Sequence, residues 1–411
     1  MKVNQPTAFV APAFVLALMI PETAKAQDWP QWRGPNRDGV AASFTEPATW
    51  PESLNQMWKV EVETGYATPI IVGDRIYMYT RQGEDEVLRS LDAATGEVVW
   101  QTEYPAPFRM NPSARNHGPG PKATPTFADG KLYTLGMSGI VSAFDAAGGE
   151  QLWHTEASAP GPLYGTAMSP LVDGRLVIVH IGNHDDGALT AFDRTTGEVE
   201  WSWDGDGPGY GSPIVVEFDG MRQVITFSQE NLVGVSGTSE DLLWQRPYTT
   251  RATQNTITPL VYRETLVVSG LGNGVEAFRV ARQDDRWVTE DIWKNREVSL
   301  YMTNGVIADD TLFGLSNRNS GQYFAIDAGS GETLWTSEGR QGTNAAIVKA
   351  GDLLLLLEDD AELIVARPSR TGLETIQKYT VADSATWAEP VVSGNRLFVK
   401  DVRTLTLWTV N

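Results

Sequence analysis

The sequence predicts an all-β protein, namely an eight-bladed β-propeller built from four-stranded antiparallel blades. Three observations predict this fold. A motif of the form A-x-D-x-x-x-G-x-x-x-W recurs along the chain, aromatic residues end repeats of similar length, and the chain stops one strand short of a complete last repeat. Because one β-hairpin cannot bury its own apolar surface, a series of such units implies blades that depend on one another.

The recurring motif consists of a strand end, a polar turn and a second strand that finishes in Trp. Its clearest copies are Ala143–Trp153, Ala191–Trp201 and Ala325–Trp335, and Leu91–Trp100 is a close variant. The turn Asp can accept hydrogen bonds from the backbone N–H groups just ahead of it, and the Gly can take positive φ. The Trp offers a large apolar face, which we expect to pack between neighbouring units.

The repeats begin near residue 68, and the strand pattern is clearest in the first one. Its four strands are expected at 68–72, 75–80, 86–93 and 97–103, with turn residues between them. The aromatic residues that end successive repeats lie roughly 42 to 53 residues apart, a spacing typical of propeller blades. These residues are Trp58, Trp100, Trp153, Trp201, Trp244, Trp293, Trp335 and Tyr379.

We expect a propeller domain over residues 55–411 whose two ends close on each other. After Tyr379 the chain offers three more strands and lacks a fourth. The stretch 55–62 is a lone strand that carries a repeat Trp without the strands that precede it elsewhere. This strand is therefore predicted to complete the last blade, and the resulting ring has no open sheet edge.

Residues 1–26 have the pattern of a secretory signal peptide. Lys2 supplies the basic start, residues 8–20 form an apolar run too short to span a bilayer, and Ala24–Ala26 matches the small-residue cleavage site. We predict cleavage after Ala26. The mature protein is then expected to be periplasmic or secreted, without a stable membrane anchor.

The N-terminal segment 27–54 is expected to be irregular, because its first part is rich in Trp, Pro, Gly and Arg. One interpretation is a structural plug in which Trp29 and Trp32 pack against the propeller. The alternative is a binding lip, built from Trp32, Arg33, Asn36 and Arg37.

Charge and cysteine content exclude several classes of function. The net charge of −20 argues against nucleic acid or an anionic membrane surface as a partner. The chain has no cysteine, which excludes disulfides, thiolate metal sites, covalent haem attachment and a lipid-bearing cysteine after the signal peptide. An exported protein without disulfides must be held together by its core and by the closure of its ring.

The A-x-D-x-x-x-G-x-x-x-W motif resembles the tryptophan-docking repeat of the pyrroloquinoline-quinone (PQQ) propeller superfamily. The stretch WPQWRGPNRDG at residues 29–39 is similar to the start of exported PQQ-like repeat proteins. The resemblance covers residues 55–411. That superfamily includes quinoprotein alcohol dehydrogenases and the non-enzymatic scaffold component of the outer-membrane β-barrel assembly machinery, so the fold alone does not decide the function.

The resemblance implies two alternative functions. Enzymes of the superfamily hold PQQ in the propeller channel between a Trp floor and a ring formed by two adjacent Cys, beside a Ca²⁺ held by Glu, Asn and Asp, with an Asp as general base. This sequence has no Cys, is shorter than those enzymes and offers no Asp in a matching setting. It also departs from the scaffold component, a lipoprotein, in lacking the lipid-bearing Cys.

We therefore expect an exported, non-enzymatic binding or scaffolding module of the cell envelope, with no catalytic residue and no metal ligand assigned. The alternative is a PQQ-dependent dehydrogenase that oxidises an alcohol or sugar, with PQQ and Ca²⁺ as cofactors in the channel. The sequence leaves both alternatives open.

A binding site is expected where the loops between consecutive blades gather at the channel mouth. The ligand is predicted to be an envelope protein or an aromatic or anionic small molecule, with arginines as anion donors and Tyr or Trp rings for stacking. The alternative is that these groups fix loop turns and satisfy buried backbone. The candidate residues are Arg109, Arg115, His117, Tyr164, Tyr210, Arg251, Asn255, Tyr301, Asn304, Arg340, Asn344 and Trp387.

A second cluster lies in the stretch VHIGNHDDGAL. His180, His184 and the pair Asp185–Asp186 include the ligand types of a metal site. On a strand that runs into a loop, however, the two histidines need not face one way. The alternative is a solvated GNHDDG turn between the second and third strands of a blade.

Overall fold

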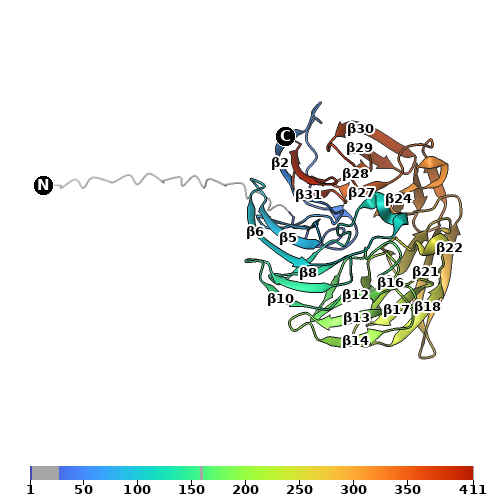
Figure 1. The fold of residues 1–411 in the computed structure, drawn as a ribbon. Coiled ribbons are helices and arrows are strands. Elements are labelled where there is room, and N and C mark those ends of the chain that lie inside the picture. Colours follow the sequence, from blue (N-terminus) through green and yellow to red (C-terminus); the bar gives the residue numbers. More distant parts are fainter. Residues whose placement is uncertain (2–26, 158–160, 411) are drawn as a thin grey trace.

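The computed structural model describes residue 1, residues 27–157 and residues 161–410, so the predicted signal peptide lies outside the described residues apart from Met1. Figure 1 shows sheets that follow one another around a ring. Helix in the described residues is confined to the 3₁₀ segments η1 (Pro112–His117), η2 (Arg251–Thr253) and η3 (Arg318–Ser320). None of these described helices has the length and apolar character needed to cross a membrane.

The prediction of an eight-bladed all-β propeller is confirmed. In blades 1 to 6 the four antiparallel strands follow chain order, whereas blades 7 and 8 each receive a further strand from the N-terminal part of the chain. The blades are numbered here in the order of their first strands. Blade 1 contains β3 (Ile70–Val72), β4 (Arg75–Gln82), β5 (Asp85–Asp92) and β6 (Val98–Pro105), and blade 2 contains β7 (Thr126–Ala128), β8 (Lys131–Leu135), β9 (Val141–Asp145) and β10 (Gln151–His154). Blade 3 contains β11 (Leu171–Asp173), β12 (Leu176–Gly182), β13 (Gly187–Asp193) and β14 (Val199–Trp203), and blade 4 contains β15 (Ile214–Phe218), β16 (Met221–Phe227), β17 (Asn231–Ser236) and β18 (Leu242–Pro247). Blade 5 contains β19 (Leu260–Tyr262), β20 (Thr265–Gly270), β21 (Gly274–Gln283) and β22 (Arg286–Asn295), and blade 6 contains β23 (Val306–Ala308), β24 (Thr311–Ser316), β25 (Gln322–Asp327) and β26 (Thr333–Thr336). Blade 7 contains β27 (Ala345–Ala350), β28 (Leu353–Glu358), β29 (Glu362–Ser369) and β30 (Gly372–Thr380), and blade 8 contains β31 (Val391–Ser393), β32 (Arg396–Lys400) and β33 (Thr404–Thr409).

Blade 8 is completed by a strand from the other end of the chain. Strand β2 (Asn55–Glu61) pairs antiparallel with β33, so that Asn55 lies opposite Thr409 and Glu61 lies opposite Thr404. Figure 1 accordingly shows β2, in blue, beside the red strands near the C-terminus. The predicted closure of the ring is therefore present, over nearly the predicted residues.

The segment 27–54 contains one short strand that the sequence did not indicate. Strand β1 (Val40–Ala41) adds in parallel to β27, so that the sheet of blade 7 has five strands. The rest of the segment before β2 is irregular apart from an isolated bridge of Trp29 with Ile71. This added strand attaches the N-terminal segment to a blade distant in sequence.

The recurring motif joins several pairs of consecutive blades, since the Trp of one blade lies over the motif Gly of the next at Gly96, Gly149, Gly197 and Gly331. In blade 2, Asp145 Oδ1 accepts the backbone N–H of Ala147 at 3.1 Å and of Gly148 at 2.8 Å. Trp100 of blade 1 donates from Nε1 to the carbonyl of Ala146 at 3.1 Å, and its ring covers Gly149 so closely that a Cβ atom there would overlap it. The motif Gly is therefore required by the Trp of the preceding blade as well as by its own φ of 75°.

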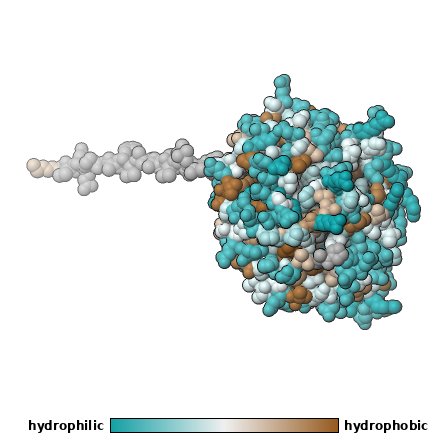
Figure 2. Space-filling view, viewed as in Figure 1, coloured by the Kyte–Doolittle hydropathy of each residue, from teal (hydrophilic) through white to brown (hydrophobic). Residues whose placement is uncertain are grey.

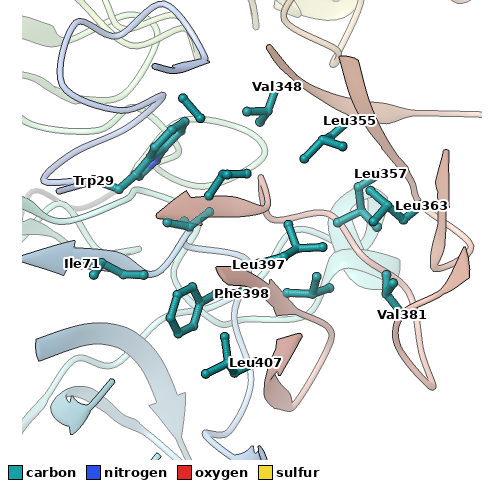
Figure 3. Close-up of a cluster of buried hydrophobic side chains, with 14 of the residues drawn as sticks. Trp29, Ile71, Val348, Leu355, Leu357, Leu363, Val381, Leu397, Phe398 and Leu407 are labelled. Carbon is teal, nitrogen blue, oxygen red and sulfur yellow. The ribbon is translucent and has the colours of Figure 1, made fainter. Parts of the chain in front are cut away.

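The apolar core lies between the blades and beneath the N-terminal segment. Figure 3 shows one part of it, where Trp29 lies with Ile71, Val348 and Phe398 from blades 1, 7 and 8. Figure 2 shows a mostly hydrophilic outer surface with scattered apolar residues, as expected for an acidic chain. Burial of an aromatic or branched side chain of this kind stabilises a fold by about 1.5–3 kcal/mol.

A series of hydrogen bonds links the blades around the channel. Thr68 N–H donates to Thr124 Oγ1 at 3.2 Å, Thr124 N–H to Ser169 Oγ at 2.9 Å, and Ser169 N–H to Ser212 Oγ at 3.0 Å. Two further links are Glu389 N–H to Thr68 Oγ1 at 3.1 Å and Thr258 N–H to Asn304 Oδ1 at 2.8 Å. We call the residues just before the first strands the blade-head residues: Thr68, Thr124, Ser169, Ser212, Thr258, Asn304, Asn344 and Glu389.

Candidate functional site

The centre of the ring is filled by residues 29–39, which we call the channel plug. Arg33 is 1% exposed; its Nη1 lies 3.3 Å from Glu389 Oε1, and its Nη2 donates to the carbonyl of Gly305 at 2.7 Å. Arg37, also buried, donates to the carbonyls of Pro213, at 2.9 Å, and Pro170. These acceptors stand at the starts of blades 3, 4, 6 and 8, so the two arginines connect blades from several sides of the ring.

Most of this segment is buried in the channel, as in the interpretation of a structural plug. One residue of the alternative binding lip, Trp32, also reaches a cavity on the loop side. Trp29 is fully buried. Trp32 donates from Nε1 to Thr258 Oγ1 at 3.0 Å and presents its ring to the loop side of the plug. Arg33 and Arg37 are engaged inside the channel, and their pKa values are lowered by burial.

Two cavities adjoin the plug. The first, which we call the mouth cavity, has a volume of about 300 Å³ and is bounded by Trp32 and by blade-head residues such as Ser212 and Thr258. The second has a volume of about 530 Å³ and is bounded by Arg37 and by first-strand residues such as Ile214. Since the first strands run from the blade heads into the channel, the two cavities lie on opposite sides of the plug.

The mouth cavity has mainly aromatic and uncharged polar walls. Its aromatic residues come from the inter-blade loops and from the plug. Asn and Gln amides and Ser or Thr hydroxyl groups lie between them. The lining residues are Trp32, Tyr66, Ser113, Ala114, His117, Lys122, Tyr164, Ala167, Tyr210, Ser212, Gln254, Thr256, Thr258, Tyr301, Met302, Asn304, Asn344 and Trp387.

One aromatic group of the cavity consists of Tyr66, His117 and Trp387. The rings of His117 and Trp387 meet edge to face with centroids 4.6 Å apart, and Tyr66 lies 6.3 Å from His117 and 6.4 Å from Trp387. Burial and the nearby charge of Lys122 lower the pKa of His117 below its usual value. The group therefore offers largely uncharged aromatic surfaces near neutral pH.

The second aromatic group is held by hydrogen bonds. Tyr164 and Tyr210 have ring centroids 5.7 Å apart, and Tyr164 N–H donates to Tyr210 Oη at 3.2 Å. His184 Nε2 lies 3.0 Å from the same hydroxyl, and its Nδ1 lies 3.2 Å from the carbonyl of Pro208. Burial raises the pKa of Tyr210. These bonds fix the orientation of the Tyr210 ring at the cavity wall.

Lys122 is the charged residue of the cavity. Its Nζ donates to the carbonyl of Tyr164 at 2.8 Å, and burial lowers its pKa to about 8. The described residues that line the cavity include no Asp or Glu. The ammonium group therefore faces aromatic rings and neutral dipoles.

The structure brings one set of the predicted site residues together and places the others elsewhere. Asn255 is fully buried and donates to the carbonyls of Ser228, Gln229 and Tyr248, which matches the alternative that some candidates satisfy buried backbone. The predicted residues that line the mouth cavity are His117, Tyr164, Tyr210, Tyr301, Asn304, Asn344 and Trp387.

The predicted anion donors Arg109, Arg115, Arg251 and Arg340 are exposed, and none of them lines the mouth cavity. Arg115 lies on η1, whose single buried residue is Ala114, and η2, which begins at Arg251, has no buried residue. Arg115 and Arg251 lie on short 3₁₀ turns that direct their side chains to solvent, and Arg109 and Arg340 are exposed in irregular loops.

A positional signal explains the cavity residues that the sequence analysis missed, above all Tyr66 and Lys122. In blade after blade, the residue two positions before the blade-head residue lines the cavity. The residues at this position are Tyr66, Lys122, Ala167, Tyr210, Thr256, Met302 and Trp387. Aligning the repeats on their Thr-Pro and Ser-Pro dipeptides identifies this position in blades 1 to 5, and so includes Tyr66 and Lys122.

The cluster around His180 does not form a metal site in the described residues, where no group of three or more His, Cys, Asp and Glu is placed to hold a metal ion. His180 is fully buried, its Nε2 lies 2.8 Å from the carbonyl of Asp206, and burial lowers its pKa to about 4. The GNHDDG stretch is the turn between β12 and β13. Asn183 Oδ1 shapes this turn by accepting backbone N–H bonds from Asp185 and Asp186.

Comparison with known proteins places the chain in a family. A family model described as outer membrane protein assembly factor BamB matches residues 50–119 and 84–337, which together span more than half of the chain. The chain belongs to this family. BamB of Yersinia pestis is 22% identical over 376 residues, covering 85% of this chain and 86% of the relative. BamB of Burkholderia pseudomallei is 26% identical over 362 residues, covering 84% and 85%.

Quinoprotein dehydrogenases also resemble this BamB-family chain, over shorter stretches of sequence. Quinohemoprotein alcohol dehydrogenase of Comamonas testosteroni is 26% identical over 197 residues, which are 44% of this chain and 26% of the enzyme. Its crystal structure superposes with a TM-score of 0.69 at 14% identity, covering 93% of this chain and 80% of the enzyme chain. BamB of Moraxella catarrhalis superposes with a TM-score of 0.62 at 17% identity, covering 87% and 99%. At these identities the structural likeness shows the fold.

The residues of the mouth cavity do not fit PQQ held together with Ca²⁺. Ca²⁺ in proteins takes oxygen ligands, among which carboxylates are prominent. The described residues lining this cavity provide amide, hydroxyl and phenol oxygens but no carboxylate. The donor set of the mouth cavity therefore gives no support to the dehydrogenase alternative.

Proposed function

We propose that this protein is an exported binding module of the cell envelope, which holds an envelope partner at the mouth of its channel and takes part in the assembly of outer membrane proteins. The observation that carries the proposal is that the same loop position lines a single cavity at seven of the eight blades. The names of its BamB relatives supply the process. A ring that directs one side chain from each of many loops to one place has the geometry of a recognition site.

The chemistry of the mouth cavity supports a binding role. Aromatic side chains are enriched at sites of recognition, because they provide a large contact area with few rotatable bonds. A volume near 300 Å³ lies at the small end of ligand pockets and suits a small molecule or one side chain of a partner. A larger partner would therefore anchor a residue here and cover the surrounding loops.

The channel plug supports the same role, because it gives the cavity a fixed floor. Trp32 is held by its bond to Thr258, and Arg33 and Arg37 attach the residues that follow it to several blades. A floor that is already ordered loses little conformational freedom when a partner binds. The cavity is thus prepared for binding before the partner arrives.

Photo-crosslinking in the producing cells tests this proposal. A photoreactive amino acid replaces Tyr301, which lines the mouth cavity, and in a matched control it replaces Val199, which is 58% exposed on the outer strand β14. We expect the Tyr301 variant to form a discrete adduct with an envelope protein of the outer membrane assembly pathway, identified by mass spectrometry. Adducts of equal yield at both positions, or none at Tyr301, would refute the mouth as the binding face.

A further inference from the structure

Lys122 is an unusual residue for the place that it occupies. The protein carries a net charge of −20, and Lys122 is the one Lys or Arg among the described residues that line the mouth cavity. It is also the only member of its loop position, two residues before the blade head, that carries a charge in the described blades. In an acidic protein, a cation at this point adds a positive end to an otherwise neutral aromatic cavity.

The ammonium group of Lys122 has donor capacity left for a ligand. An ammonium has three N–H donors, and the described residues supply one acceptor, the Tyr164 carbonyl at 2.8 Å. No carboxylate among the described residues lines the cavity to balance the charge. Burial lowers the pKa of Lys122 to about 8 without an opposing contribution from an acidic neighbour.

A charge that is partly removed from water and left without a counter-ion is held at a cost, which a bound anion offsets. A carboxylate is suited to this task, since an ammonium–carboxylate hydrogen bond is stronger than one between neutral groups. The rings of Trp32, Tyr301 and Trp387 line the same space and favour an apolar or aromatic body. The cavity thus combines one anion donor with an aromatic wall.

We infer that the mouth cavity recognises a single carboxylate carried on an aromatic or apolar body, with Lys122 as the anion donor and the aromatic rings as the wall. This inference rests on the proposed function, because it names the chemical group by which the partner is held. Two sources offer this chemistry, namely the C-terminal carboxylate of a polypeptide and a free small organic acid.

The test uses the purified full-length mature protein and measures affinity by titration calorimetry and by tryptophan fluorescence. N-acetylphenylalanine serves as the carboxylate probe and N-acetylphenylalanine amide as its neutral counterpart. We expect the carboxylate to bind about tenfold more tightly, as one charge-assisted hydrogen bond implies. The Lys122→Met variant keeps the apolar stem and should lose this preference, whereas Lys122→Arg should retain it.

A second lysine provides the charge-matched control. Lys131 at the start of β8 does not line the mouth cavity, so Lys131→Met changes the net charge equally without touching the site. We expect Lys131→Met to bind both probes as the unmodified protein does. Equal affinity for carboxylate and amide, or the same loss of preference in Lys131→Met, would overturn the inference.

A third probe separates the two sources. Phenylacetate carries the carboxylate and the ring without a peptide bond. Tighter binding of N-acetylphenylalanine than of phenylacetate assigns the site to a polypeptide end, and the reverse order assigns it to a free acid. Both orders support carboxylate recognition, provided that Lys122→Met abolishes it.

The inference and the proposed function can fail separately. If the Tyr301 crosslink forms and persists in Lys122→Met while no probe shows a carboxylate preference, the inference is wrong and the binding role stands. If the probes show a carboxylate preference that depends on Lys122 but the Tyr301 crosslink is absent, carboxylate recognition by the cavity is retained. The proposal that the mouth binds an envelope partner is then wrong.

Discussion

Glu358, at the end of β28, is a buried carboxyl group whose protonation is coupled to folding. Its Oε1 accepts a hydrogen bond from Tyr323 Oη at 2.8 Å. Burial, together with the charges of Asp360 and Glu362, raises its pKa to about 7, against the opposing effect of the Tyr323 bond. Because the pKa in the folded protein exceeds that in the unfolded chain, the folded state binds more protons between pH 4.5 and about 7.

The stabilisation from Glu358 is therefore fully present below about pH 4.5 and is lost as the pH rises through about 7. We predict that Glu358→Gln flattens the dependence of the free energy of unfolding on pH over this range, and that its largest gain over the unmodified protein appears above pH 7. Urea unfolding at a series of pH values measures the difference. Glu389, whose pKa burial also raises to about 7, contributes to the slope of both proteins and cancels in the comparison. Parallel pH profiles would contradict the prediction.

At this scale the sequence was informative about which loops meet and uninformative about which side chains point inward. Tyr210, Tyr301 and Trp387 were named as aromatic residues of the inter-blade loops, whereas Tyr66, aromatic and at the same loop position as Tyr210 and Trp387, was missed. Arg251 was expected at the cavity, but its side chain lies on a short 3₁₀ turn and is exposed. Such a turn leaves no periodic pattern in the sequence. Lys122 was missed because two facts single it out, and both depend on the folded ring. Its loop position lines the cavity, and the described lining residues include no carboxylate.

Among the elements, the joint between consecutive blades is the feature that the sequence predicted most completely. The motif Asp accepts the turn N–H groups and the motif Trp covers the turn of the next blade. Both contacts are local in sequence or separated by one blade, so a repeated pattern suffices to predict them. The pairing of β1 with β27 was not predicted, because two residues carry no detectable strand pattern.

The joint can be tested with two glycines that share a backbone conformation and differ in their surroundings. Gly149 has φ of 75° and lies under the Trp100 ring, whereas Gly130 has φ of 76° and no atom within 4 Å of a Cβ position. Alanine at either site incurs the backbone strain of positive φ, about 1–2 kcal/mol. We predict that Gly149→Ala costs a further 1–3 kcal/mol, approximately, because it must displace the ring.

The measurement is the difference in free energy of urea unfolding between Gly149→Ala and Gly130→Ala. Near-ultraviolet circular dichroism should also change in Gly149→Ala, since the environment of Trp100 is altered. Equal destabilisation by the two substitutions would mean that the packing of Trp100 on the turn contributes little to the joint.

Over the whole molecule, the ring is held in two ways: by strand β2 in blade 8 and by the plug at the centre. The number of blades and the closure by β2 were predictable, because repeat spacing and a missing strand are properties of the sequence. The sequence is compatible with two interpretations of residues 29–39, a structural plug and a binding lip, and does not decide between them. Its arginines bind carbonyl groups at the starts of several blades, and backbone carbonyls have no sequence signature.

We predict that Arg33→Met destabilises the protein by about 3–5 kcal/mol, because it leaves Glu389 buried without its partner and frees the carbonyl of Gly305. The matched control is Arg175→Met. Arg175 is 66% exposed and pairs with Glu200 on the surface, so this change should destabilise the protein far less. Chemical unfolding followed by tryptophan fluorescence measures both. Similar costs for the two variants would show that the plug does not hold the ring together.

The position of the plug also determines the order of events when the protein is made. Arg33 and Glu389 are separated by 356 residues, so Arg33 meets its partner only after most of the last blade has left the ribosome. Contacts of such long range form slowly. Until then Trp29 and Trp32 have no completed channel in which to be buried. The centre of the ring is thus the last place to be completed.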